Sequence, residues 1–234
     1  MTQGKVTEKP LMFTGPNIQK ILARQKTQTR RVVSDRNSIG NFKASELILD
    51  KAWIDGGPSP AGNGGPYLHA PVNAPEIERR RGWKSGDCDP EVIERLYPRM
   101  QVGDRFWVKE AYYAESRETI HYRADGWAYE DDPNSGWKSP LFMPRWASRI
   151  TLEVTKVRAQ RLQDISEEDA QAEGVEHDEL VGYYCDERDG EFGMHRCNWR
   201  AGYRAMWDSI NGKKSPWESN PFVFAITFTV LEKR

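Results

Sequence analysis

The chain has 234 residues, of which 34 are lysine or arginine and 35 are aspartate or glutamate, so its formal net charge is −1. This length allows a sizeable core, and the balanced charge argues against a uniformly basic groove for duplex nucleic acid. The three cysteines are unevenly spaced, which argues against a disulfide framework. Because no apolar run approaches about 20 residues and "MTQGKVTEKP" resembles no signal peptide, we expect no membrane span and a cytoplasmic location.

Charge is distributed unevenly along the chain. Residues 17–36 contain six cations and one anion, whereas residues 164–191 contain twelve acids and one cation. A basic and an acidic segment in one chain favour a local site for a short strand, a loop or a nucleotide.

The first segment expected to fold is "LMFTGPNIQKILARQKTQTRRVV". Pro16 suits the first turn of a helix, and the apolar residues that follow recur at helical spacing, so we predict a short helix that ends near Gln25. The six residues "KTQTRR" come next and place an amine, two hydroxyls and two guanidiniums close together.

Strands are expected in the middle and at the end of the chain. A Gly-Asp turn precedes the strand-forming "RFWVKEAYY", which has a hairpin partner around Ile120–Arg123. Residues 150–157 alternate as a half-buried strand that leads into a helix. Residues 199–210 carry a helical apolar stripe, and "FVFAITFTVL" alternates as a core strand.

Two stretches are interpreted as insertions. Residues 35–97 contain "DGGPSPAGNGGP", whose glycine and proline content predicts irregular loop. Residues 176–197 are acidic and show no clear periodicity.

Several segments together resemble the ASCH family, a branch of the PUA-like β-barrels. They are "ILARQKTQTRR", "GDRFWVKE", "ISEEDAQAEGV" and "NPFVFAITF", while "MPRWASRITLEV" and "WDSING" are similar to the longer ASCH proteins of phages and prophages. The resemblance covers residues 10–34 and 99–234. It implies a single α+β domain over residues 10–234: a PUA-like (ASCH) small mixed β-barrel with short flanking helices and two long insertions.

The resemblance also implies a site. The family has a central cleft that accepts RNA or a nucleoside, and some small bacterial members are amidohydrolases that remove the acyl group from acetylated cytidine. Their active lysine, threonine and glutamate correspond to Lys26, Thr29 and Glu173, with no cofactor. This sequence departs from the family pattern at Arg24, where the pattern has Gly, and also at Gln25 and Arg30.

Lys26 and Thr29 are three residues apart. Such positions point to opposite faces of a strand but share one side of a helical turn, so joint action predicts a helix end or tight loop here. In the simpler interpretation, Lys26, Arg30 and Arg31 only interact with the negative end of the preceding helix.

Glu173 follows a helix that Ser166 and Asp169 are expected to begin as a capping box, with Gly174 as the C-cap. A carboxylate is unfavourable at the negative end of a helix. Glu173 therefore indicates a cationic partner or a function, the alternative being a solvated surface acid.

Other residues are candidates for ligand binding. Arg30 and Arg31 offer planar forks suited to phosphate or a base edge. In "MPRWASR", Arg145 and Arg149 flank Trp146, which could stack on a base. The alternative is that Trp146 belongs to the core.

The sequence contains no complete motif for a metal site or for a classical hydrolase. His177, Cys185, His195 and Cys197 are zinc-type ligands, but no CxxC pair accompanies them, so we predict no metal site. There is also no GxSxG, HExxH or phosphate-binding glycine loop.

Three hypotheses follow. In the first, the protein binds RNA or a modified nucleoside: a charged Lys26 holds a phosphate or carbonyl, and Glu173 reads a base edge. In the second, it is an amidohydrolase in which a neutral Lys26 activates Thr29, which requires the lysine pKa to fall by about 3 units from 10.4. In the third, it is a phage structural or host-interaction protein whose insertions carry the function.

Overall fold

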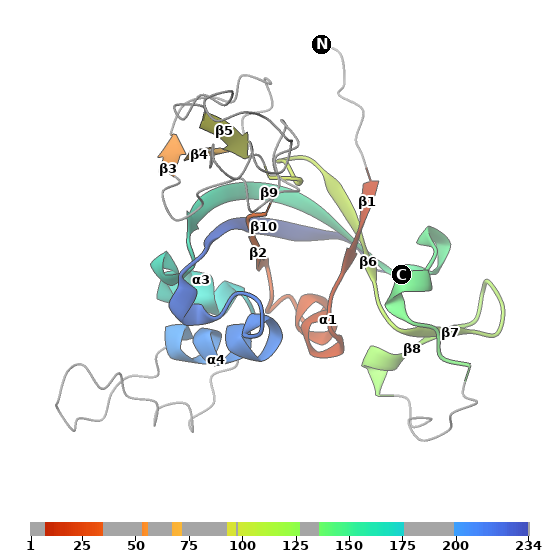
Figure 1. The fold of residues 1–234 in the computed structure, drawn as a ribbon. Helices are drawn as coiled ribbons and strands as arrows, with labels where there is room; N and C mark the ends of the chain where they lie inside the picture. Colours follow the sequence, from red (N-terminus) through yellow and green to blue (C-terminus); the bar gives the residue numbers. More distant parts are fainter. Residues whose placement is uncertain are drawn as a thin grey trace, which may run out of the picture.

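The computed structural model describes residues 8–34, 53–55, 67–71, 93–96, 98–126, 136–175 and 199–233. These residues form a mixed α+β fold around a five-stranded sheet (Figure 1). In spatial order its strands are β1 (Glu8–Met12), β6 (Arg105–Lys109), β9 (Ile150–Arg161), β10 (Phe222–Lys233) and β2 (Gln28–Val32). β1 and β6 are parallel, and the other neighbours are antiparallel.

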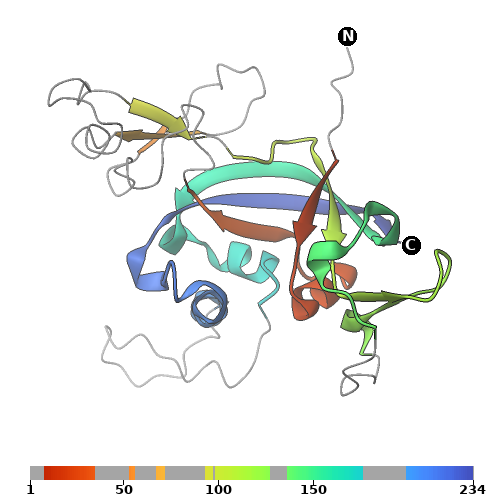
Figure 2. The ribbon, with the colours of Figure 1, turned by 45° about the vertical axis from the view of Figure 1, so that its right-hand side comes forward.

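The sheet is open in the part of the chain that the structure describes. β1 and β2 are its two edge strands and are not hydrogen-bonded to each other, so the closed barrel expected from the sequence is not formed there. The chain between them is helix α1 (Gly15–Leu22), which lies between their lower ends in Figure 1. The long strands β9 and β10 arch over the helices (Figure 2), and their pairing shifts register after Thr227 and Val230, as bulges that bend a strand do.

Both faces of β10 are buried. Phe224 and Ile226 point into a core that also contains Ile18 and Ile21 of α1. Val223 points the other way and packs in a second cluster, under the helices α3 (Glu167–Ala172) and α4 (Trp199–Asn211). The core strand and both the first and last helices predicted from apolar periodicity are therefore confirmed.

The first insertion contains a small sheet. Its described residues form the antiparallel strands β3 (Trp53–Asp55), β4 (Tyr67–Pro71) and β5 (Ile93–Leu96). Ala70 and Leu96 are fully buried in the main core. Of the stretch predicted as irregular loop, "DGGPSPAGNGGP", residues 56–66 lie outside the described residues. The second insertion, residues 176–197, lies outside the described residues.

The predicted hairpin is confirmed as β7 (Tyr112–Ala114) and β8 (Ile120–Tyr122). Its Tyr112 packs with Met143 and Ala147 in a third cluster. The remaining helices among the described residues are the short 3-10 turns η4 (Arg123–Asp125), η5 (Pro140–Phe142), η6 (Arg145–Ala147), η7 (Leu162–Asp164) and η9 (Trp217–Ser219). Among the described helices, none has the length and apolar character needed to cross a membrane.

Candidate ligand-binding pocket

A pocket of about 240 Å³ lies along β2. Its walls come from the end of β1, the start of α1, β2 itself, the residue after α3, and α4. The charged lining residues are Lys26, Arg30, Arg31 and Glu173; the uncharged ones are Met12, Phe13, Thr14, Asn17, Thr29, Val32, Tyr203, Met206, Trp207, Ile210 and Asn211. The pocket therefore has one polar, charged wall and one apolar, aromatic wall.

The edge position of β2 explains why side chains from both of its faces reach one pocket. The carbonyl of Thr27 accepts a hydrogen bond from the Phe228 amide, and the Val33 amide donates to the Phe222 carbonyl. This register turns the peptide groups of Thr29 and Arg31 toward β10 and leaves those at positions 28, 30 and 32 on the outer edge. Lys26 lies in the tight connection between α1 and β2, as predicted, whereas Thr29 lies in β2 itself, and both line the pocket.

The turn between α1 and β2 is made without glycine. Arg24 has φ 59°, in the left-handed region, which costs a non-glycine residue about 1–2 kcal/mol. The Lys20 carbonyl accepts hydrogen bonds from the amides of Gln25 and Lys26. The turn therefore has an arginine in the left-handed conformation that favours glycine.

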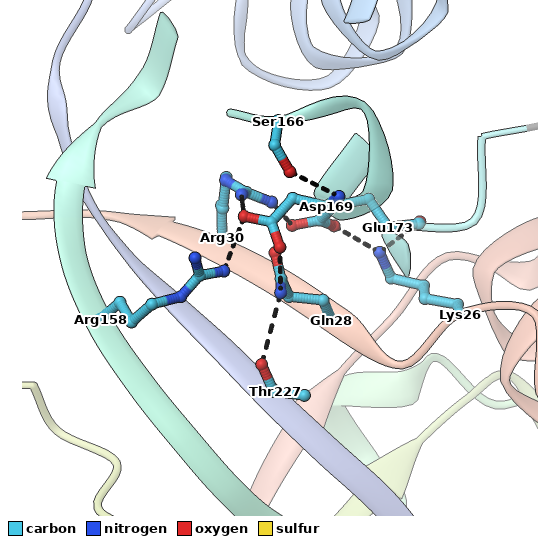
Figure 3. Close-up of polar contacts among 8 residues, drawn as sticks. All are labelled: Lys26, Gln28, Arg30, Arg158, Ser166, Asp169, Glu173 and Thr227. Atoms are coloured by element: carbon cyan, nitrogen blue, oxygen red, sulfur yellow. Dashed lines mark hydrogen bonds and ion pairs between the residues drawn. The ribbon is translucent and has the colours of Figure 1, made fainter. Parts of the chain in front are cut away.

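Lys26, Arg30 and Glu173 form a buried charge cluster; their exposed fractions are 3%, 4% and 2%. Lys26 Nζ donates to Glu173 Oε2 at 2.6 Å and to the Glu173 carbonyl at 2.7 Å, and Arg30 Nη1 donates to Glu173 Oε1 at 2.9 Å (Figure 3). The cationic partner expected for Glu173 is confirmed, and the surface-acid alternative is wrong. Lys26 also interacts with a helix C-terminus, but with that of α3 rather than of α1.

A second acid extends the cluster. Asp169 accepts hydrogen bonds from Arg30 Nη2 at 2.9 Å, Arg158 Nη2 at 2.6 Å and Gln28 Nε2 at 3.1 Å (Figure 3). From the sequence, Asp169 is expected only as part of the capping box, and Ser166 Oγ does accept a hydrogen bond from the Asp169 amide. The spacing of Asp169 and Glu173, four residues apart on one helix, was the signal for a shared acidic face.

Burial and charge act in opposite directions on Lys26. Burial lowers its pKa, while Glu173 acts to raise it, and the net direction is downward. Because Nζ has three N–H donors and two of them are bonded to Glu173, one donor is left. The pKa of Tyr203, beside Arg30, is raised by burial and by the charge of Glu173, so its hydroxyl is protonated.

Gly174 brings the end of α3 against the Lys26 side chain. Its φ is +79°, and a Cβ there would meet Lys26 Cβ at 3.0 Å. Gly126 has a similar φ of +75°, but a Cβ there would have no neighbouring atom within 4 Å. Replacing Gly126 with alanine therefore measures the backbone cost of a left-handed alanine alone, about 1–2 kcal/mol. We expect Gly174→Ala to lower the free energy of unfolding in urea by at least about 1 kcal/mol more than Gly126→Ala, because the added methyl group overpacks the cluster. Equal losses would show that Lys26 tolerates the contact.

The other predicted binding residues do not line this pocket. Arg145 pairs with Glu8 at 2.9 Å. Arg149 donates from Nε and Nη2 to the two carboxylate oxygens of Glu110. Burial raises the pKa of Glu110, against the effect of Arg149. Trp146 is 41% exposed, with Arg117 5.6 Å from its ring centre, so its assignment to the core is wrong.

The candidate zinc ligands His177, Cys185, His195 and Cys197 lie outside the described residues. Within the described ranges, no group of three histidine, cysteine, aspartate or glutamate side chains is arranged to hold a metal ion.

The pocket contains the three residues to which the ASCH resemblance assigns an active site, Lys26, Thr29 and Glu173. Arg30 and Arg31, predicted as binding residues, line it as well. The resemblance rests on short segments of the chain. The chain matches no protein-family model, no curated protein and no solved structure.

Proposed function

We propose that this pocket binds a single nucleoside, free and modified or as one nucleotide of an RNA. The observation that supports this most is the composition of its wall. Lys26, Thr29 and Glu173 offer donors and acceptors for the edge of a base, and Tyr203 and Trp207 offer aromatic surface for its ring. We extend the proposal to the fold: the open sheet with Lys26 and Glu173 bridged at its edge is a PUA-like, ASCH-type arrangement.

The size of the pocket limits the ligand. An apolar cavity of about 150 Å³ holds one benzene molecule, and this pocket measures about 240 Å³. It therefore suits one base with part of its sugar, whereas a run of stacked bases needs more room. Long RNA would have to place one unstacked nucleotide here, as sequence-specific RNA-binding proteins commonly require.

The hydrogen bonds of Lys26 favour binding over catalysis. The carboxylate of Glu173, 2.6 Å from Nζ, stabilises the charged form of Lys26, in which all three N–H groups are donors. A charged Lys26 can donate its third hydrogen to a carbonyl of the ligand but cannot accept a proton from Thr29. Glu173 is already shared by two cations, and this holds the donors in place before the ligand arrives.

A second candidate function is hydrolysis of acylated cytidine. Two observations favour it: burial lowers the pKa of Lys26, and the Thr29 hydroxyl has no hydrogen-bond partner among the described residues. In this reaction water adds to the acyl carbon, the bond from that carbon to the exocyclic nitrogen breaks, and a carboxylate and cytidine are released. Lys26 would take the proton of the nucleophile and return it to the leaving amine.

The test combines calorimetric titration of nucleosides with chromatography after incubation with acetylated cytidine. Thr29→Val removes a hydroxyl without a partner in the described chain, so we expect unchanged stability but nucleoside affinity about fivefold to tenfold lower, as for one neutral hydrogen bond. Thr229→Val, at an exposed position of β10, is the matched control and should bind like the natural protein. Turnover that Thr29→Val abolishes would establish the hydrolase instead. Failure to bind or convert any nucleoside would contradict both functions.

A further inference from the structure

We infer that the ligand of this pocket is anionic and carries a phosphate group, which Arg31 binds. The inference rests on the proposed function and narrows its ligand from a nucleoside to a nucleotide. It is carried by the charge balance of the pocket and by the position of Arg31 on β2.

The charged groups of the pocket do not cancel. Among the described lining residues, Lys26, Arg30 and Arg31 are cations and Glu173 is the only acid. Glu173 pairs with Lys26 and Arg30, and Asp169 pairs with Arg30 from outside the lining. The described part of the pocket therefore keeps positive charge that its described acids do not compensate.

Arg31 carries that surplus. Within the described chain it forms no ion pair, its guanidinium donates one long hydrogen bond of 3.4 Å to the Met12 carbonyl, and it lies 5.7 Å from the ring centre of Phe13. The residue is exposed, so most of its five N–H donors remain available to a ligand. A planar guanidinium matches two oxygens of one phosphate better than any other side chain does.

The strand geometry separates this group from the buried cluster. Thr29 and Arg31 are two residues apart on β2, so their side chains share one face, while Arg30 points to the other. Thr14 and Asn17 line the pocket, and neither side chain has a hydrogen bond within the described residues. A phosphate on Arg31 can accept from these neutral groups while the base reaches Lys26 and Glu173 across the edge of the strand.

Two phosphate sources share this chemistry, a free nucleotide and the backbone of RNA. Calorimetric titrations should compare the four ribonucleosides and acetylated cytidine with their 5′-monophosphates and with dinucleotides, using the whole chain. Tighter binding of a dinucleotide than of the monophosphate assigns the phosphate to RNA. The reverse order assigns it to a free nucleotide.

We expect the natural protein to bind a monophosphate about tenfold more tightly than its nucleoside, and high salt to reduce this preference. Arg31→Gln should bind both ligands with the affinity that the natural protein has for the nucleoside. Arg204→Gln makes the same charge change on α4, in an exposed pair with Glu218, and should keep the preference.

Equal affinity of the natural protein for nucleoside and monophosphate would overturn the phosphate inference and leave nucleoside binding intact. A preference that persists in Arg31→Gln would overturn the role of Arg31. Absence of binding by every compound would overturn the proposed function and this inference together.

Discussion

Glu173→Gln is expected to lower the free energy of unfolding by about 3–5 kcal/mol, the usual cost of removing one partner from a buried ion pair. Glu173 is the carboxylate that Lys26 and Arg30 share, and all three side chains are almost completely buried. Glutamine keeps the shape of the side chain but removes the charge that compensates two cations. Urea denaturation followed by tryptophan fluorescence measures the loss.

The control is Glu218→Gln. Glu218 pairs with Arg204 at 2.6 Å, but its side chain is 70% exposed, and exposed pairs contribute about 0–1 kcal/mol. Because the same substitution is made at both positions, the difference between the two stability losses measures the effect of burial. Similar losses at positions 173 and 218 would contradict the view that the cluster is an energetic unit.

The double variant Lys26→Met with Glu173→Gln is expected to regain at least about half of the stability lost by Glu173→Gln alone, because replacing both charges of a buried pair leaves no unpaired ion. Arg30 keeps Asp169 as its partner. Ligand affinity should nevertheless fall about 10-fold to 100-fold below that of the natural protein, since the charged donor is gone. This variant is thus expected to recover stability without recovering ligand affinity.

The measurement is a double-mutant cycle in urea, which includes Lys26→Met alone, together with calorimetric titration of the nucleoside. A double variant no more stable than Glu173→Gln would mean that Lys26 and Glu173 are not coupled. A double variant that binds the nucleoside as well as the natural protein does would remove Lys26 from the proposed site.

Part of the site followed from local rules. The capping box at Ser166 and the glycine at position 174 defined the ends of α3, and the unfavourable place of Glu173 at its C-terminus indicated a cationic partner. Apolar periodicity likewise indicated α1 and β10. These features depend on residues a few positions apart, and for that reason they can be derived from the sequence.

Other features depend on contacts between distant segments. Lys26 and Glu173 are 147 residues apart, and no local rule states that the segment after Lys26 becomes an edge strand on β10. The sequence predicts a helix end or tight loop for Lys26 and Thr29 together, but Thr29 lies in β2. The resemblance also implied a closed barrel, which the described strands do not form.

The sequence by itself thus determined the helices, the core strand β10 and the need of Glu173 for a cationic partner, because propensity, capping and periodicity act over one or two turns of chain. Only the tertiary structure decided that β2 ends the sheet, that Asp169 joins Glu173, and that Arg31 is left without an acid among the described residues. Strand order and charge pairing are set by packing across the whole chain, where every segment competes for the same partners.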